Sequence, residues 1–254
     1  TTWENVLMET LLPPEPAPDP KLMLGGIVIA NVLLPHHRIG RYLLYPLSFL
    51  STWAHEMGHV LATMISGGRV ERVEIYANLA GKVMSKRPRT LWAAFLSPTL
   101  GLLGPSVAGA VIIVGGTYPR GIEWILEGLG ALVVVSTMIW VRNPFGVFFS
   151  AIVGGGILYL STLPGRMATF WLIQALGIRF AVESLSDFRY LFAKKAGENQ
   201  LSDTAQLAQH FLIPHWVWGI LIGSLSVCIL AGALYLAWGE VVMPPSIREK
   251  MHLP

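Results

Sequence analysis

Long apolar runs dominate this sequence and constrain the fold more than any other feature. A helix needs roughly 20 apolar residues to cross a bilayer. The runs that approach or exceed this length span residues 42–66, 91–115, 121–141, 145–163, 167–192 and 212–238. A shorter run, 22–35, precedes them. The pattern predicts an all-α polytopic membrane protein with about six transmembrane helices plus a short N-terminal hydrophobic segment.

Composition and charge agree with this class. Only 13% of the 254 residues are charged, against about 25% in soluble domains. The net charge of +3 is small and the basic residues lie in loops, which favours the lipid bilayer over nucleic acid as a partner. The single cysteine, Cys228, excludes an intrachain disulfide and a Cys-rich zinc site.

Three regions follow from these patterns. Residues 1–21 contain the run PPEPAPDP, whose prolines cannot continue a helix, and are expected to form an acidic tail or linker. Residues 22–240 form one membrane-embedded domain, and 241–254 form a C-terminal tail.

The motif HEMGH, His55 to His59, lies inside the first long apolar run. Residues i and i+4 of a helix lie one above the other, so His55 and His59 present two imidazoles to one point with Glu56 beside them. Placing ionisable side chains in a membrane-length segment costs about 2–3 kcal/mol each, so such residues usually have a partner and a function. The motif predicts part of a Zn²⁺ site, with His55 and His59 as ligands and Glu56 as general base.

The segment after this helix has a different character. Gly67 and Gly68 are expected to end the helix, and an alternating stretch containing Val73 and Ile75 follows. With a turn at 78–81 and a second short strand, this predicts a small β-hairpin at the membrane surface over about 70–85. Its edge, at Val73 and Ile75, is a candidate binding site for an extended substrate segment.

A catalytic zinc usually takes three protein ligands, so a carboxylate must complete the site. Asp187 is our first candidate, because a helix continuing past Glu183 would carry it to the depth of His59. Glu183 and Asp203 are the runners-up. Asp203 follows a polar loop, where Ser202 or Asp203 is also expected to cap a helix.

Taken together, these segments resemble the site-2 protease family of intramembrane zinc metallopeptidases, particularly its compact bacterial branch without a PDZ domain. The resemblance covers roughly residues 42–240 and depends on HEMGHVLATMISGGRVERVEI, SPTLGLLGPSVAGA, SLSDFRYLF and SDTAQLA. It implies zinc held by His55, His59 and a downstream aspartate, with Glu56 as general base. Better-known members carry that aspartate in an Asp-Gly pair, which this chain lacks.

The resemblance implies an integral, multi-pass protease of the bacterial cytoplasmic membrane that hydrolyses peptide bonds of transmembrane substrates. Two alternatives remain open at this stage. One is a membrane protease of the CAAX-processing type, in which a glutamate such as Glu183 completes the site. The other is a catalytically inactive scaffold or subunit that binds a partner transmembrane helix.

Overall fold

The computed structural model describes residues 19–118, 121–163, 166–186, 192–195 and 201–242. In chain order its elements are α2 (Pro20–Leu33), the 3-10 helix η1 (Leu34–His36), α3 (Arg38–Ile65), β1 (Arg69–Ile75), β2 (Gly81–Lys86), α4 (Leu91–Gly115), α5 (Gly121–Ile139), α6 (Pro144–Ser161), α7 (Arg166–Ser186), α9 (Asp203–Phe211) and α10 (His215–Val242). No PDZ domain is evident among the residues described.

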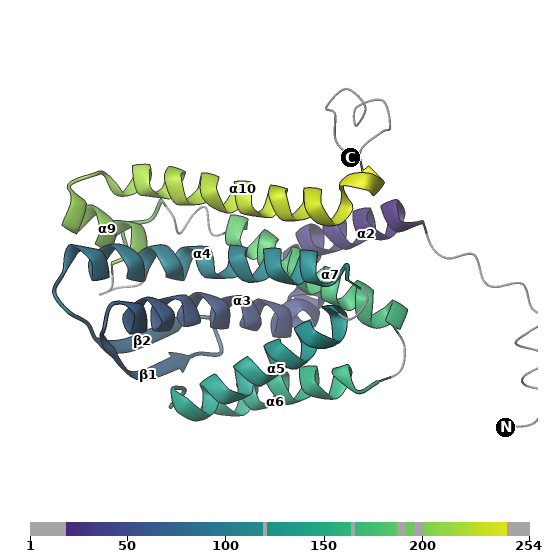
Figure 1. Cartoon of the computed structure of the whole chain (residues 1–254), viewed down its shortest axis with the longest axis horizontal. Coiled ribbons are helices and arrows are strands. Elements are labelled where there is room, and N and C mark those ends of the chain that lie inside the picture. The colour runs from purple at the N-terminus through teal and green to yellow at the C-terminus, as the bar shows by residue number, and fades with distance from the viewer. Residues whose placement is uncertain (1–18, 119–120, 164–165, 187–191, 196–200, 243–254) are drawn as a thin grey trace, which may run out of the picture.

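Helices α3, α4 and α10 lie side by side, with α4 in the middle, and α5 and α6 pair below α3 (Figure 1). Fully buried apolar side chains, such as Phe49 of α3 and Phe180 of α7, fill the space between helices. Large apolar side chains also cover the outside, among them Leu132, Phe148 and Leu236. An apolar exterior is what a lipid environment stabilises, because lipid tails solvate such side chains.

Four or five membrane-spanning helices can be identified among the described residues. Among the described residues, α4, α5, α6 and α10 are each long and apolar enough to span a bilayer. A fifth span is obtained if α2 with η1 and α3, which meet at a bend of 114°, count as one. α7, which contains Arg179 and Glu183, is not among the helices that are long and apolar enough to span a bilayer. The predicted count of about six is therefore not confirmed, while the helical membrane class is.

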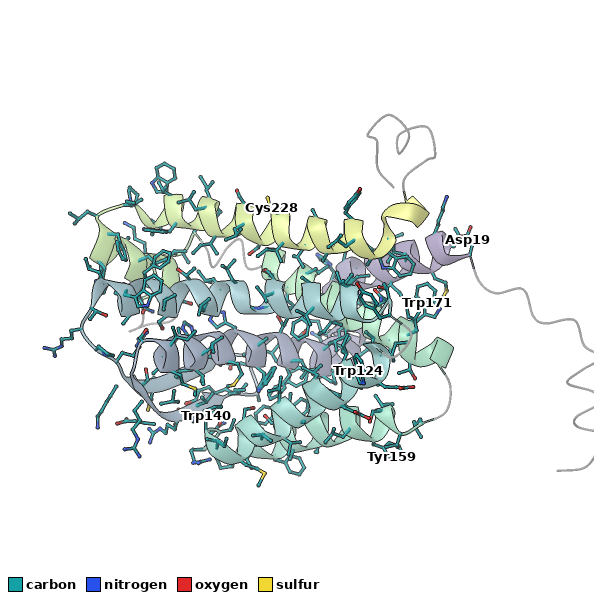
Figure 2. All side chains as sticks on the ribbon, viewed as in Figure 1. Asp19, Trp124, Trp140, Tyr159, Trp171 and Cys228 are labelled. Atoms are coloured by element: carbon teal, nitrogen blue, oxygen red, sulfur yellow. The ribbon has the colours of Figure 1, made fainter. Side chains whose placement is uncertain are left out.

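Aromatic side chains lie toward both ends of the α5–α6 pair. Trp124 and Tyr159 are toward one end and Trp140 is toward the other (Figure 2). Trp124 and Tyr159 are also exposed. Tyr and Trp favour the interface between lipid and water, so we expect these side chains to lie near the two boundaries of the membrane layer.

The chain after α3 forms the expected pair of strands. Gly67, with φ of 72°, follows the C-cap residue Ser66, which is where a left-handed residue ends a helix. β1 and β2 then pair antiparallel, with Val73 opposite Val83 and a bulge between Val70 and Arg72. The predicted two-stranded element is confirmed, and its location at the membrane surface stays a prediction.

Candidate metal and catalytic site

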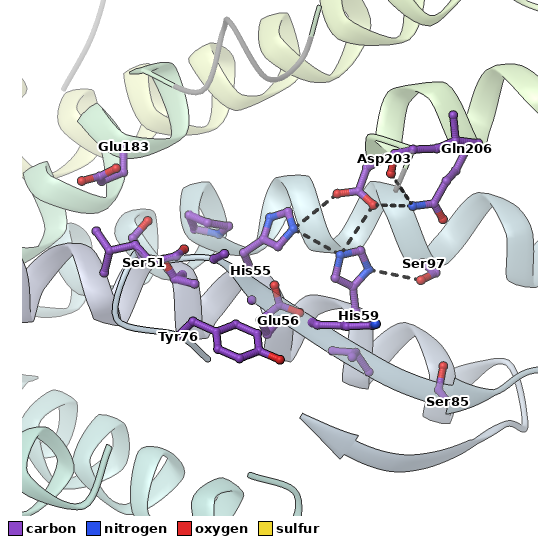
Figure 3. Close-up of a pocket in the computed structure, with 18 of the residues that line it drawn as sticks. Ser51, His55, Glu56, His59, Tyr76, Ser85, Ser97, Glu183, Asp203 and Gln206 are labelled. Carbon is purple, nitrogen blue, oxygen red and sulfur yellow. Dashed lines mark hydrogen bonds and ion pairs between the residues drawn. The ribbon is translucent and has the colours of Figure 1, made fainter. Parts of the chain in front are cut away.

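Helix α3 presents both motif histidines on one face, and Asp203 meets them from α9 (Figure 3). The Nε2 atoms of His55 and His59 are 3.2 Å apart. Asp203 Oδ2 lies 3.3 Å from His55 Nε2, and Asp203 Oδ1 lies 3.6 Å from His59 Nε2. Three side chains separated by up to 148 positions of sequence thus converge on one point.

The spacing of these atoms fits a zinc ion. Ligands arranged tetrahedrally at zinc–nitrogen and zinc–oxygen distances of about 2.0–2.1 Å lie about 3.3–3.4 Å from one another. The observed separations of 3.2, 3.3 and 3.6 Å fall close to that value, the last two being measured from different oxygens of Asp203. Two imidazoles and one carboxylate are also the ligand types that zinc prefers, and three protein ligands leave a fourth position for water or substrate.

Local sequence explains why Asp203 is available to the histidines. Ser202 caps α9, accepting a hydrogen bond from the backbone N–H of Ala205 at 3.2 Å. The cap therefore does not need the Asp203 carboxylate, which is buried and faces α3. Burial alone raises the pKa of Asp203, but the neighbouring His59 and His55 more than offset it, so the pKa lies well below its ordinary value.

Two further side chains hold the ligands in position, and nothing in the sequence pattern pointed to either. Ser97 of α4 lies 3.2 Å from His59 Nδ1, and Gln206 donates to Asp203 Oδ1 at 3.3 Å. Because the Nε2 of His59 faces Asp203, its Nδ1 is the nitrogen that can carry the proton and donate to Ser97 Oγ. Such outer partners fix the tautomer and the orientation of metal ligands.

Glu56 lies next to the histidines, buried between α3 and the start of β2. A Cβ built on Gly81 would lie only 2.2 Å from Glu56 Oε1, so glycine is what allows the strand to approach the carboxylate. The turn before Gly81 is tied to α3 by two hydroxyls. Tyr45 donates to Ala77 O at 2.8 Å, and Thr52 donates to Leu79 O at 3.1 Å.

A cavity of about 780 Å³ extends from the histidines between α3, the hairpin, α4, α7 and α9. Glu56 and Asp203 line it together with the histidines. Glu183 of α7 lines its far part, on the side of Ser51 (Figure 3). A space of this size accommodates an extended segment of several residues beside the cluster.

The other two carboxylate candidates have different outcomes. Asp187 lies outside the described residues. Glu183 forms an ion pair with Arg179 and accepts a hydrogen bond from Ser48 at 2.7 Å. Arg179, which is buried, also donates to the backbone oxygen of Asn31 at 3.1 Å. Glu183 thus belongs to a polar network that joins α7 to α3 and α2, away from the histidine pair.

The two hairpin residues predicted to bind substrate already pack against, and hydrogen-bond to, other parts of this chain. Val73 and Ile75 have fully buried side chains. On the outer side of β1, the N–H of Val73 donates to Trp140 O at 2.8 Å, and the Asn143 side chain bonds both the N–H and the oxygen of Ile75. Among the described residues no strand pairs with the other edge of the sheet, that of β2, and β2 lines the cavity.

We expect Gly101→Ala to weaken metal binding. Gly101 of α4 packs on His59, and an added Cβ would lie 2.5 Å from ring atoms Cε1 and Nε2, so the ring must move. Displacing a ligand by this route is expected to lower zinc affinity by about 10–100-fold, as loss of an outer partner does. Competition with a fluorescent chelator measures the affinity. Gly128→Ala in α5 is the matched control, because nothing lies within 4 Å of its Cβ position. Wild-type affinity in Gly101→Ala would contradict the close packing.

Comparison with protein families bears on all of these observations. A family model described as Peptidase M50B-like matches residues 23–233, which include α3, the hairpin and Asp203. No curated protein and no solved structure matches the chain significantly. The family match covers most of the sequence and includes every residue of the histidine–aspartate cluster. This chain therefore belongs to the M50B-like peptidases, the site-2 protease family of membrane metallopeptidases.

Proposed function

We propose that this protein is a zinc-dependent endopeptidase that cleaves transmembrane segments of other proteins. Its family and its long apolar helices support an integral membrane metallopeptidase. The observation that carries the finer proposal is the convergence of His55, His59 and Asp203 beside buried Glu56 at one cavity. By analogy with the bacterial branch that the sequence resembles, we place it in a bacterial cytoplasmic membrane.

His55, His59 and Asp203 would hold the zinc, and Glu56 supplies the proton transfer. The chemistry that zinc would supply there is a lowered pKa of a water molecule and polarisation of the scissile carbonyl. Glu56 takes a proton from the attacking water and delivers it to the departing amine. Ser97 and Gln206 keep the ligands in place, so the site is preorganised before substrate arrives.

The substrate must unwind before it can be cut, because a helix hides its backbone in its own hydrogen bonds. The unwound segment then needs new partners for its N–H and C=O groups. The edge of β2 can provide them, since it faces the cavity and starts beside Glu56. We therefore assign substrate pairing to β2, in place of Val73 and Ile75 of β1.

Cleavage of a matched pair of substrates tests this function. The purified protein is analysed for metal and reconstituted with a single-span substrate that carries Gly and Pro near midspan, or with an all-Leu version. We expect about one zinc per chain and faster cleavage of the helix-broken substrate. A zinc content near zero together with no cleavage of either substrate would refute the proposal.

A further inference from the structure

One cation at the rim of the cavity is not accounted for by the chemistry above. Arg87 follows the end of β2 and lines the cavity together with Ser97 and Asp203. Within the described part of the chain it has no hydrogen bond and no ion pair. Of the nearby hairpin cations, Arg72 pairs with Glu74 at 3.1 Å and Lys86 pairs with Glu71 at 2.8 Å. Lys82, at the other end of β2, also lines the cavity and forms no ion pair among the described residues.

The acids of the cavity form no ion pair with Arg87 in the described part of the chain. Asp203 faces the two histidines, and Glu183 is paired with Arg179. Glu56 is buried beneath Gly81 at the opposite end of β2. Arg87 is exposed at the rim; partial desolvation lowers the pKa of its guanidinium, and the charge of Asp203 raises it.

The direction of β2 gives Arg87 a defined position relative to the catalytic residues. β2 runs alongside α3 in the same direction, because Gly81 touches Glu56 and Ser85 accepts a hydrogen bond from Thr63 at 3.3 Å. Arg87 thus lies near the C-terminal end of α3. At about 3.3 Å per residue, it is about 20 Å along the strand from Gly81.

We propose that Arg87 selects substrates by binding an acidic side chain at this end of the unwound segment. This deepens the proposed function and rests on it. In a strand paired along β2, the residue opposite Arg87 is about six positions from the residue opposite Gly81, which lies beside Glu56. The separation is about four positions if the Arg87 side chain reaches a diagonal neighbour. An Asp or Glu there forms a charge-assisted pair with the guanidinium, and a Lys is repelled.

A position scan tests the proposal. Single-span peptides with a central Gly-Pro break carry one Asp, Asn or Lys at each position on both sides of the break. Binding to the Glu56→Gln variant in nanodiscs of uncharged lipid is measured by fluorescence anisotropy, and cleavage by the wild type is measured in parallel. We expect Asp to improve binding about tenfold over Asn at one position, four to six residues from the cleaved bond, and Lys to weaken it.

Charge reversal supplies the controls. Arg87→Glu should reverse the charge preference, so that Lys peptides bind better than Asp peptides at that same position. Arg89→Glu, which adds the same charge two residues further on but outside the cavity, should leave the preference unchanged. The preference is read from binding, so it can be observed even if no peptide is cleaved, and in that case only the proposed peptidase activity fails.

Four results would overturn the role of Arg87. The first is equal binding of Asp, Asn and Lys peptides at every position. The second is a charge preference that Arg87→Glu does not alter. The third is binding that depends on the fraction of anionic lipid in the nanodisc and not on the peptide, which would assign Arg87 to a lipid headgroup. Absence of binding by every peptide counts against it as well.

Discussion

Glu56→Gln is expected to abolish peptide cleavage while zinc binding is retained. The amide has the shape of the carboxylate, so the packing of residue 56 against Gly81 persists. It cannot accept a proton from water, however, and loss of a positioned general base lowers the rate by about 10²–10⁴-fold. The measurement is turnover of a reconstituted single-span substrate, with the zinc content of the same preparation determined alongside.

Glu71→Gln is the matched control for this variant. Glu71 is a carboxylate of the same hairpin region, but it lies on the surface paired with Lys86 and does not line the cavity. Its substitution should leave both zinc content and turnover unchanged. Undiminished turnover in Glu56→Gln would remove Glu56 as the base, and a preparation that lost its zinc would show that residue 56 supports the metal site instead.

Most of the fold follows from sequence patterns that are local. The long apolar runs predicted the helices, and Gly67 and Gly68 correctly marked the end of the helix that carries HEMGH. Alternation around Val73 predicted a strand, but not which side of it would be covered. That depends on residues 140–143, which are distant in sequence and add to β1 through Trp140, Arg142 and Asn143. No local pattern encodes such a contact.

In the candidate site too, relations between residues close in sequence could be predicted, and contacts between residues far apart in sequence could not. The i, i+4 spacing placed His55 and His59 together, because helix geometry fixes their relation. The ranking of Asp187 as first candidate assumes one continuous helix through that position, which lies outside the described residues, so it stays a prediction. Ser202 was recognised as a possible cap, and it does cap α9. Ser202 and Asp203 are both able to cap a helix, and a cap needs only one of them. This pair was the signal in the sequence that left Asp203 available as a ligand.

Asp203→Asn should remove zinc from the protein. The amide preserves size and most of the packing at this buried position, but it carries no charge and is a poor ligand for zinc. Loss of a direct ligand should exceed the effect of losing an outer partner, so we expect affinity to fall by more than about 100-fold. Competition with a chelator measures it, and cleavage should fall in parallel.

Comparison with two other carboxylates decides whether Asp203 is the third ligand. Glu183→Gln should keep its zinc, because Glu183 is held by Arg179 and Ser48 and not by the histidines. Asp187→Asn should also keep it if the cluster of His55, His59 and Asp203 is the metal site. If Asp187→Asn loses zinc and Asp203→Asn retains it, the short distances from Asp203 to the imidazoles would be hydrogen bonds of a metal-free state. The third ligand would then be Asp187.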